Sequence, residues 1–223
     1  MGHNSVLFRI VTSTLLLLCL TFPATAATGV GTVTHLNGPL FGKKADGASR
    51  TLAVNSAVEQ ADTLVTEKRT YGRVKFTDGG EVTLRPGSNF VVESYLFDKG
   101  KPSEDKAVFG LVKGSLRAVT GQVSKRGNQD AYKMKTLTAT IGVRGTSFDL
   151  KICKDDCPGL PNGLYFFVID GVIEVSNKGG TRTFGAGQYG YVRDEDSMPE
   201  ELPFDPKLEF TMPPFWIDAC GVK

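Results

Sequence analysis

The sequence predicts an all-β fold built from short strands and tight turns. From Gly31 onward, apolar and polar residues alternate with a period of two, which is typical of strands that bury one face. Glycines interrupt this alternation at short intervals, and no stretch carries the apolar stripe of an amphipathic helix. Because strands usually run about five or six residues, successive runs must coil tightly or form a meander.

The first 26 residues have the pattern of a secretory signal peptide. One basic residue, Arg9, precedes an apolar run over residues 10–20, and Ala24 and Ala26 supply the small residues that signal peptidase recognises. We therefore expect cleavage after Ala26 and a periplasmic or secreted location for the rest of the chain.

Two other fates of this segment are disfavoured. Residues 12–14 are hydroxyl-bearing and interrupt the apolar run, whereas a membrane-spanning helix needs about 18 consecutive apolar residues. Lipid attachment at Cys19 is disfavoured because the preceding residue, Leu18, is not small. Every later apolar run is short, so we expect no membrane span after cleavage.

The charge of the chain argues against nucleic-acid binding. The formal net charge is +2, and cleavage removes one positive charge, Arg9. A nucleic-acid-binding domain needs clustered lysines and arginines in a basic domain. The length suits one domain. We place that domain at residues 27–193 and an acidic, proline-rich tail at residues 194–223.

Residues 73–97 carry the clearest strand signal. Val74, Phe76 and Val82 alternate with polar residues, and the intervening Asp78 and Gly79 suit a hairpin turn because both tolerate positive φ. Further strands are predicted at residues 108–119, 138–152 and 181–192, and residues 164–176 are interpreted as two strands joined around Gly171. Glycines inside the first two of these strands suggest bends, bulges or close backbone packing. We expect a solvated loop at 98–106 and a polar linker at 121–133.

The composition of the tail differs from that of the domain. Its prolines prevent it from continuing a sheet interior. Phe210, Phe215 and Trp216 make its end too apolar for a purely disordered segment, and we expect them to pack back onto the domain.

Three cysteines remain after cleavage. Cys153 and Cys157 are disulfide candidates, because a bond between them would close a small loop in an oxidising compartment. Pairing of Cys220 with either of them is an open alternative, since connectivity does not follow from sequence. A zinc site built from the three thiolates and His35 is disfavoured because the spacing matches no standard zinc pattern.

Standard catalytic motifs are missing from the sequence. His35 is the only histidine after residue 26, and a nucleophilic serine or cysteine usually needs a histidine base. The acidic groups at residues 155–156 and 194–196 do not follow a calcium-loop spacing and are interpreted as solvated turns. We expect no enzymatic activity, no cofactor and no metal. A lysine-assisted serine or a carboxylate pair would depend on spatial neighbours.

Residues 185–190 match the G-x-G-x-x-G string of dinucleotide-binding sites. Such a site requires a following helix whose N-terminus holds the pyrophosphate. Here only a few residues separate the string from the proline-rich tail, so we interpret it as a turn between short strands.

The run IGVRGTSFDL at residues 141–150 resembles the signature of the FecR domain, which occurs outside the cytoplasmic membrane in regulators of iron-siderophore uptake. Four other segments are similar to family motifs in the same order: residues 78–93, 110–118, 169–176 and 185–192. The resemblance extends over residues 31–193. It implies an exported β domain with short strands in a solenoid-like or sandwich-like arrangement.

The signature contains residues suited to shaping a bent strand. Glycine permits a sharp backbone path, apolar side chains can enter the core, and a threonine hydroxyl can bond a turn amide. We expect Arg144 to pair internally. The structural role is assigned to Gly142, Val143, Arg144, Gly145, Thr146 and Phe148.

The family's regulators carry a cytoplasmic anti-sigma domain before a membrane helix and a second extracytoplasmic lobe. Here residues 1–9 precede the apolar run and only the tail follows the FecR-like region. The resemblance therefore implies the fold and the exported location more strongly than a role in sigma-factor signalling. The sequence predicts a noncatalytic interaction or signalling-associated module whose partner is a protein or an envelope glycan. The alternatives are an envelope hydrolase with an unrecognised site and a degenerate sensor that contacts a siderophore receptor system.

Overall fold

The computed structural model describes residues 29–126, 128 and 130–207. Their regular structure consists of β-strands and one short 3-10 helix, η1 (Pro102–Glu104), which confirms the predicted all-β fold. No helix in these residues is long and apolar enough to cross a membrane. The predicted signal peptide, Cys19 and Cys220 lie outside the described residues.

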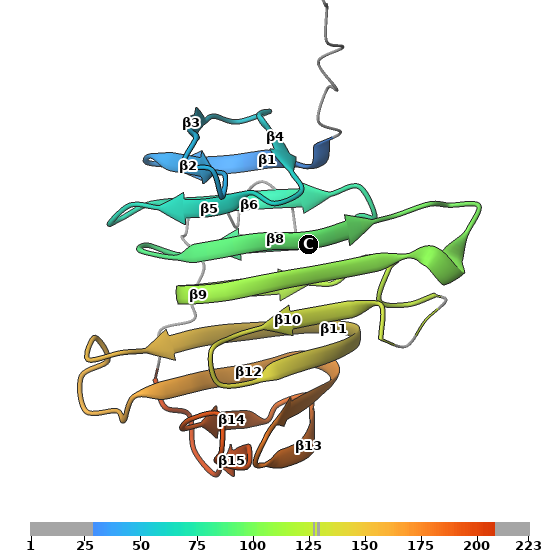
Figure 1. Cartoon of the computed structure of the whole chain (residues 1–223). Helices are drawn as coiled ribbons and strands as arrows, with labels where there is room; N and C mark the ends of the chain where they lie inside the picture. The colour runs from blue at the N-terminus through green and yellow to red at the C-terminus, as the bar shows by residue number, and fades with distance from the viewer. Residues whose placement is uncertain (1–28, 127, 129, 208–223) are drawn as a thin grey trace, which may run out of the picture.

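The strands form one mixed sheet, and they follow one another along the molecule from β1–β4 at one end to β13–β15 at the other (Figure 1). Only β9 and β10 pair in parallel among the described strands. The strands are β1 (Gly29–Asn37), β2 (Leu40–Lys43), β3 (Ser49–Leu52), β4 (Ala57–Glu59), β5 (Thr63–Thr66), β6 (Tyr71–Phe76), β7 (Glu81–Leu84), β8 (Asn89–Leu96), β9 (Lys106–Val119), β10 (Tyr132–Lys135), β11 (Thr140–Cys153), β12 (Gly163–Asn177), β13 (Gly180–Gly185), β14 (Tyr189–Val192) and β15 (Glu200–Leu202).

Two layers of the sheet share one core. The first layer contains β2, β3, β5, β8, β10 and β13, and the second contains β1, β4, β6, β7, β14 and β15. Strands β9, β11 and β12 belong to both layers. The N-terminal half of β9 pairs with β8 and β10, whereas its C-terminal half pairs with β7 and β11.

Each long strand passes between the layers at a glycine with positive φ. These glycines are Gly114 in β9 (φ 82°), Gly145 in β11 (φ 63°) and Gly171 in β12 (φ 82°). Residues other than glycine rarely adopt positive φ, because their Cβ atom collides with the neighbouring carbonyl oxygen. A Cβ at Gly114 would also lie 2.6 Å from the Cα of Ser88. Glycine is therefore required where these strands bend.

The bends explain a difference from the sequence-based expectation. We expected two strands joined around Gly171 in residues 164–176, but β12 continues through this glycine and contains 15 residues; β9 and β11, which also have interior glycines, contain 14 residues each. The interior glycines of these segments bend the strand and let its ladder continue in the other layer, so one strand replaces two short ones.

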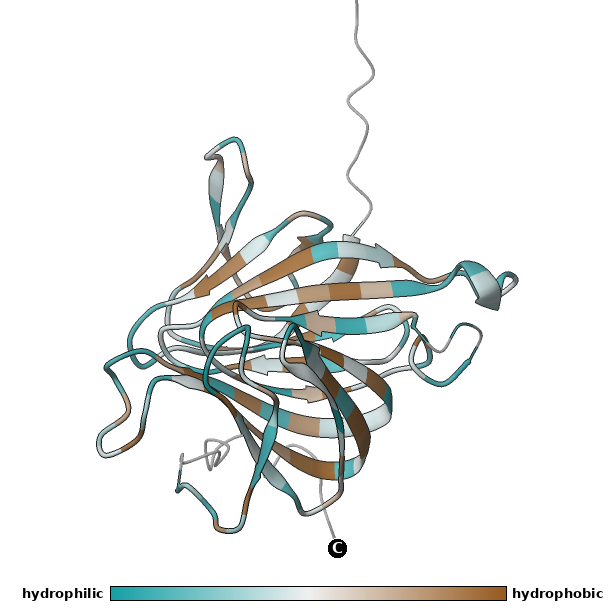
Figure 2. Cartoon of the chain, turned by 60° about the horizontal axis from the view of Figure 1, so that its bottom comes forward, coloured by the Kyte–Doolittle hydropathy of each residue, from teal (hydrophilic) through white to brown (hydrophobic). Residues whose placement is uncertain are grey.

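The core between the layers is aromatic and continuous. Phe76 of the second layer packs against Phe109 of the first with 4.8 Å between ring centroids, and Phe109 also contacts Phe90 and Tyr132. Apolar and polar residues alternate along the strands (Figure 2). The predicted period-two pattern therefore describes which side chains face the core.

The segment after residue 193 extends the sheet. We expected a tail that cannot continue a sheet interior, and β15 pairs with β14 at the edge of the sheet. An edge position leaves one side of a strand unpaired, which is compatible with nearby prolines. Residues 208–223, including Phe210, Phe215 and Trp216, lie outside the described residues.

Replacing Gly171 by alanine tests the bend. Both Gly171 and Gly79 have positive φ, 82° and 86°, but a Cβ at Gly171 would lie 2.9 Å from the Gly145 carbonyl oxygen, whereas nothing lies within 4 Å at Gly79. We expect Gly79→Ala to lower the free energy of unfolding by about 1 kcal/mol through backbone strain alone. Gly171→Ala should cost about 1–3 kcal/mol more because of the steric clash. Urea denaturation measures both, and equal losses would contradict this account of the bend.

Candidate binding site

The signature residues lie at and beside the bend of β11. Val143 and Phe148 are 3% and 0% exposed, on either side of Gly145. The Thr146 hydroxyl donates a hydrogen bond of 2.8 Å to the Val172 carbonyl oxygen, just beyond the bend of β12. The Thr146 amide donates to the Thr120 hydroxyl at 2.8 Å. These contacts support the structural role proposed for this part of the signature.

Two signature residues differ from expectation. Arg144 is exposed and forms no ion pair with the described residues, so the expected internal pairing is wrong. The alternation that buries Val143 directs the next side chain outward. Gly142 lies in regular strand pairing, and a Cβ there would meet its nearest neighbour at 3.9 Å, so the bend does not depend on it.

Cys153 and Cys157 form the predicted disulfide. The bond closes the start of the loop between β11 and β12, and both cysteines pack with Tyr165 and Tyr191. Burial raises the pKa of Tyr165 to about 12. The two bonded sulfurs are not thiolates that could join His35 in a zinc site. Among the described residues, no group of three or more His, Cys, Asp or Glu is placed to hold a metal.

The acidic groups singled out in the sequence bond within their own turns. Asp155 accepts a hydrogen bond from the Asn162 side chain at 2.8 Å, and Asp156 accepts one from the Lys154 amide at 2.9 Å. In the other turn, a hydrogen bond from Ser197 lowers the pKa of Asp194. Residues 186–188 connect β13 to β14, so the G-x-G-x-x-G string is a turn between strands.

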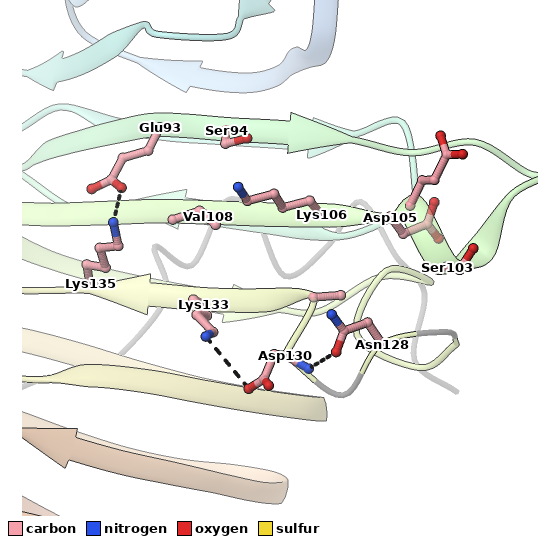
Figure 3. A pocket seen from close by; sticks show the side chains of 12 residues that line it. Glu93, Ser94, Ser103, Asp105, Lys106, Val108, Asn128, Asp130, Lys133 and Lys135 are labelled. Carbon is pink, nitrogen blue, oxygen red and sulfur yellow. Dashed lines mark hydrogen bonds and ion pairs between the residues drawn. The ribbon is translucent and has the colours of Figure 1, made fainter.

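An open groove of about 610 Å³ lies on the outer face of the first layer (Figure 3). Strands β8, β9 and β10 form its floor, and the loops after β8 and after β9 form one end. We call it the outer groove. Its lining residues are Glu93, Ser94, Ser103, Glu104, Asp105, Lys106, Val108, Asn128, Asp130, Ala131, Lys133 and Lys135.

Charges of both signs alternate across the outer groove. Lys135 Nζ lies 2.6 Å from a Glu93 carboxylate oxygen, and Lys133 Nζ lies 3.7 Å from Asp130 (Figure 3). Lys106 projects from β9 between the Glu93–Lys135 pair and the end loops (Figure 3). The floor therefore presents both hydrogen-bond donors and acceptors to a ligand.

One buried ion pair holds the two end loops together. Arg126 Nε, from the loop after β9, donates to the Asp105 carboxylate at 2.9 Å, and the Asp105 side chain is 0% exposed. The Arg126 guanidinium also donates to the Asp98 carbonyl at 2.8 Å and lies 4.6 Å from the centre of the Phe97 ring. The polar insertion at 98–106 is thus tied to the segment at 121–133 rather than simply solvated.

The phenols beneath the groove are unsuited to acid–base chemistry. Burial, together with the nearby Asp78 carboxylate, raises the pKa of Tyr132, and burial also raises that of Tyr95. Both phenols stay protonated at neutral pH and so cannot serve as general bases. The Tyr95 oxygen instead accepts a hydrogen bond from the Asp78 amide at 2.9 Å.

Sequence reasoning did not single out the outer groove. Its lining residues come from three strands and two loops whose adjacency depends on the parallel pairing of β10 with β9. The available signal was two polar insertions, 98–106 and 121–133, that flank the same predicted strand.

Comparison with known families agrees with the resemblance indicated by the signature at residues 141–150. The family model described as FecR protein matches residues 62–159. Residues 62–159 of this chain therefore match a FecR domain. The match is narrower than the 31–193 suggested by the motifs, and it includes every residue that lines the outer groove. The matched family is regulatory.

Two solved structures resemble this chain. Both are of a protein from Parabacteroides distasonis described as an anti-sigma factor, with 16% and 15% sequence identity and a TM-score of 0.48 in each case. Each match covers 65% of this chain and 61% of the other. A search of curated proteins finds no match.

Replacing Arg126 by alanine tests how the end loops of the outer groove are held. The substitution leaves the buried Asp105 carboxylate without its cation. Because Arg126 itself is 25% exposed, we expect a local loss of about 2–3 kcal/mol, less than for a fully buried pair. Hydrogen exchange should accelerate at residues 97–105.

Lys101→Ala is the matched control for Arg126→Ala. Lys101 pairs with Glu104 in the same loop, but both side chains are more than half exposed. Such a pair contributes about 0–1 kcal/mol, so exchange should hardly change. Equal acceleration in the two variants would show that the Arg126 pair does not hold the loops.

Proposed function

We propose that this FecR-domain protein is an exported, noncatalytic binding module of the cell envelope that recognises a protein partner through the outer groove. The observation that carries the proposal is the groove itself: an open, charged surface of about 610 Å³ within the matched family region. Three strands support its floor, and a buried ion pair holds its end loops. Binding sites held on rigid elements lose little conformational freedom when a ligand binds.

The lining chemistry favours a protein over a glycan. Lys106, Lys133 and Lys135 stand among carboxylates, so the groove can match a partner surface of alternating charge. None of the described lining residues is aromatic, whereas sugar rings are commonly bound by stacking on aromatic faces. Charge complementarity would supply orientation and association rate more than raw affinity, which suits a signalling contact.

Export is tested by the mass of the mature protein. Because Ala24 and Ala26 form a signal-peptidase site, protein recovered from the periplasm should have the intact mass of residues 27–223. A full-length species held in the inner membrane would overturn the predicted export of a cleaved protein.

Partner binding is tested by charge reversal in the outer groove. Lys133 and Lys75 make similar weak ion pairs, at 3.7 Å to Asp130 and 3.8 Å to Glu81, but Lys75 lies on the second layer away from the groove. A photoreactive side chain placed at Ser94 should crosslink one envelope protein. Lys133→Glu should weaken that capture about tenfold by disrupting charge complementarity, and Lys75→Glu should leave it unchanged.

Three outcomes would reject the proposal. Equal effects of Lys133→Glu and Lys75→Glu would show that the outer groove is not the contact. Crosslinking of Ser94 to an envelope glycan would replace the protein partner by a carbohydrate. Turnover of an envelope substrate by the purified protein would favour the hydrolase alternative.

A further inference from the structure

A row of polar and aromatic side chains crosses the outer face of the second layer, opposite the outer groove. Strand register places its members directly beside one another on consecutive strands from β6 to β14. We call this set the transverse row. Its members are Arg73, Thr83, Arg117, Asp149, Phe167 and Tyr189.

The transverse row has a basic end and an aromatic end. Arg73 and Arg117 lie toward β6, and Arg85 flanks them at the end of β7. Toward β14, the Phe167 and Tyr189 rings stack with centroids 4.3 Å apart and an interplanar angle of 20°. Asp149 lies between the two ends and is held by Arg117 in a bidentate pair with distances of 2.7 and 2.6 Å.

Several side chains of this outward face are nevertheless buried. Asp149 is 1% exposed, Thr83 is 4% exposed and Arg85 is 7% exposed. No strand or helix within residues 29–207 packs over them, because the second layer has the first layer only on its other side. Charged side chains are rarely this buried on an outer sheet face unless something covers them.

The last described residues turn toward the transverse row. β15 pairs with β14, and Leu202 lies directly beside Tyr189. Asp205 lies close to the Tyr189 side chain. Burial and the Asp205 carboxylate together raise the pKa of the Tyr189 phenol. Pro206 is buried. The chain therefore leaves the described structure at the aromatic end of the row.

The remaining 16 residues, 208–223, fit the row in length and chemistry. An extended segment of this length reaches roughly 50 Å, whereas the six strand spacings from β15 to β6 span roughly 29 Å. Phe210, Phe215 and Trp216 match the aromatic end, and the carboxylates of Glu209 and Asp218 complement the arginines.

We propose that the transverse row is a binding site for an extended peptide with aromatic and acidic side chains, and that residues 208–223 of the same chain occupy it. The tail would cross the strands and cover the arginines, the bidentate pair and the stacked rings. This site is distinct from the outer groove, which lies on the other layer, and it does not depend on the function proposed for that groove.

The single tryptophan of the chain gives a direct test, because Trp216 lies in the tail. In the full mature protein with Cys220→Ser, which prevents intermolecular disulfides, Trp216 emission should be blue-shifted and shielded from acrylamide compared with the urea-unfolded protein. Glu209→Lys with Asp218→Lys should move the emission toward that of the unfolded protein. The far-UV circular dichroism should keep its strand signal, since both changes lie outside the sheet.

Glu104→Lys is the matched control, because it reverses an exposed acidic residue on the opposite layer. It should leave Trp216 emission and quenching unchanged. Raising the salt concentration should expose Trp216 in the wild type, since ion pairs at a surface weaken with ionic strength.

The outcomes separate the possible occupants. Emission from wild-type Trp216 that equals the unfolded value overturns the proposal and leaves the row to another partner. Shielding that disappears on dilution, together with a dimer in sedimentation, shows exchange of tails between copies and overturns docking within one chain. Shielding that is independent of concentration and lost in the charge-reversed tail supports the proposal.

Discussion

Three strands have to change layer without breaking their hydrogen-bond ladders, and the arrangement of the other strands follows from this constraint. Gly114, Gly145 and Gly171 permit the change because only glycine adopts positive φ at little cost. The bends are also crowded: a Cβ at Gly171 would contact both the Gly145 carbonyl and the Thr146 hydroxyl. The signature therefore includes Gly145, where β11 bends, and Thr146, whose hydroxyl donates a hydrogen bond to β12.

Strand β9 connects this architecture to the two candidate surfaces. Its N-terminal half carries Lys106 and Val108 in the floor of the outer groove, and its C-terminal half carries Arg117 in the transverse row. Because β9 bends between the layers, the two surfaces face opposite sides of the molecule. This chain can in this way present an open charged groove on one side and the transverse row on the other.

Sequence patterns captured the elements whose signals are local. The alternation around Val74 and Val82, the turn at Gly79, and the disulfide of Cys153 with Cys157 all depend on residues close in the chain, and all appear in the structure. Strand continuity through Gly171 was not recognised, because a glycine inside an alternating run indicates a turn and a bend equally well. The outward position of Arg144 follows from alternation but was obscured by the expectation of an internal partner.

By itself the sequence determined the all-β class and the FecR resemblance, because period-two alternation, glycine spacing and the signature are properties of short segments. Only the tertiary structure decided that Asp105 is buried against Arg126, and that Arg117, Asp149 and Phe167 share one row. Those neighbours come from pairing between strands distant in the chain. Register and layer assignment depend on packing of the whole core, which no local pattern specifies.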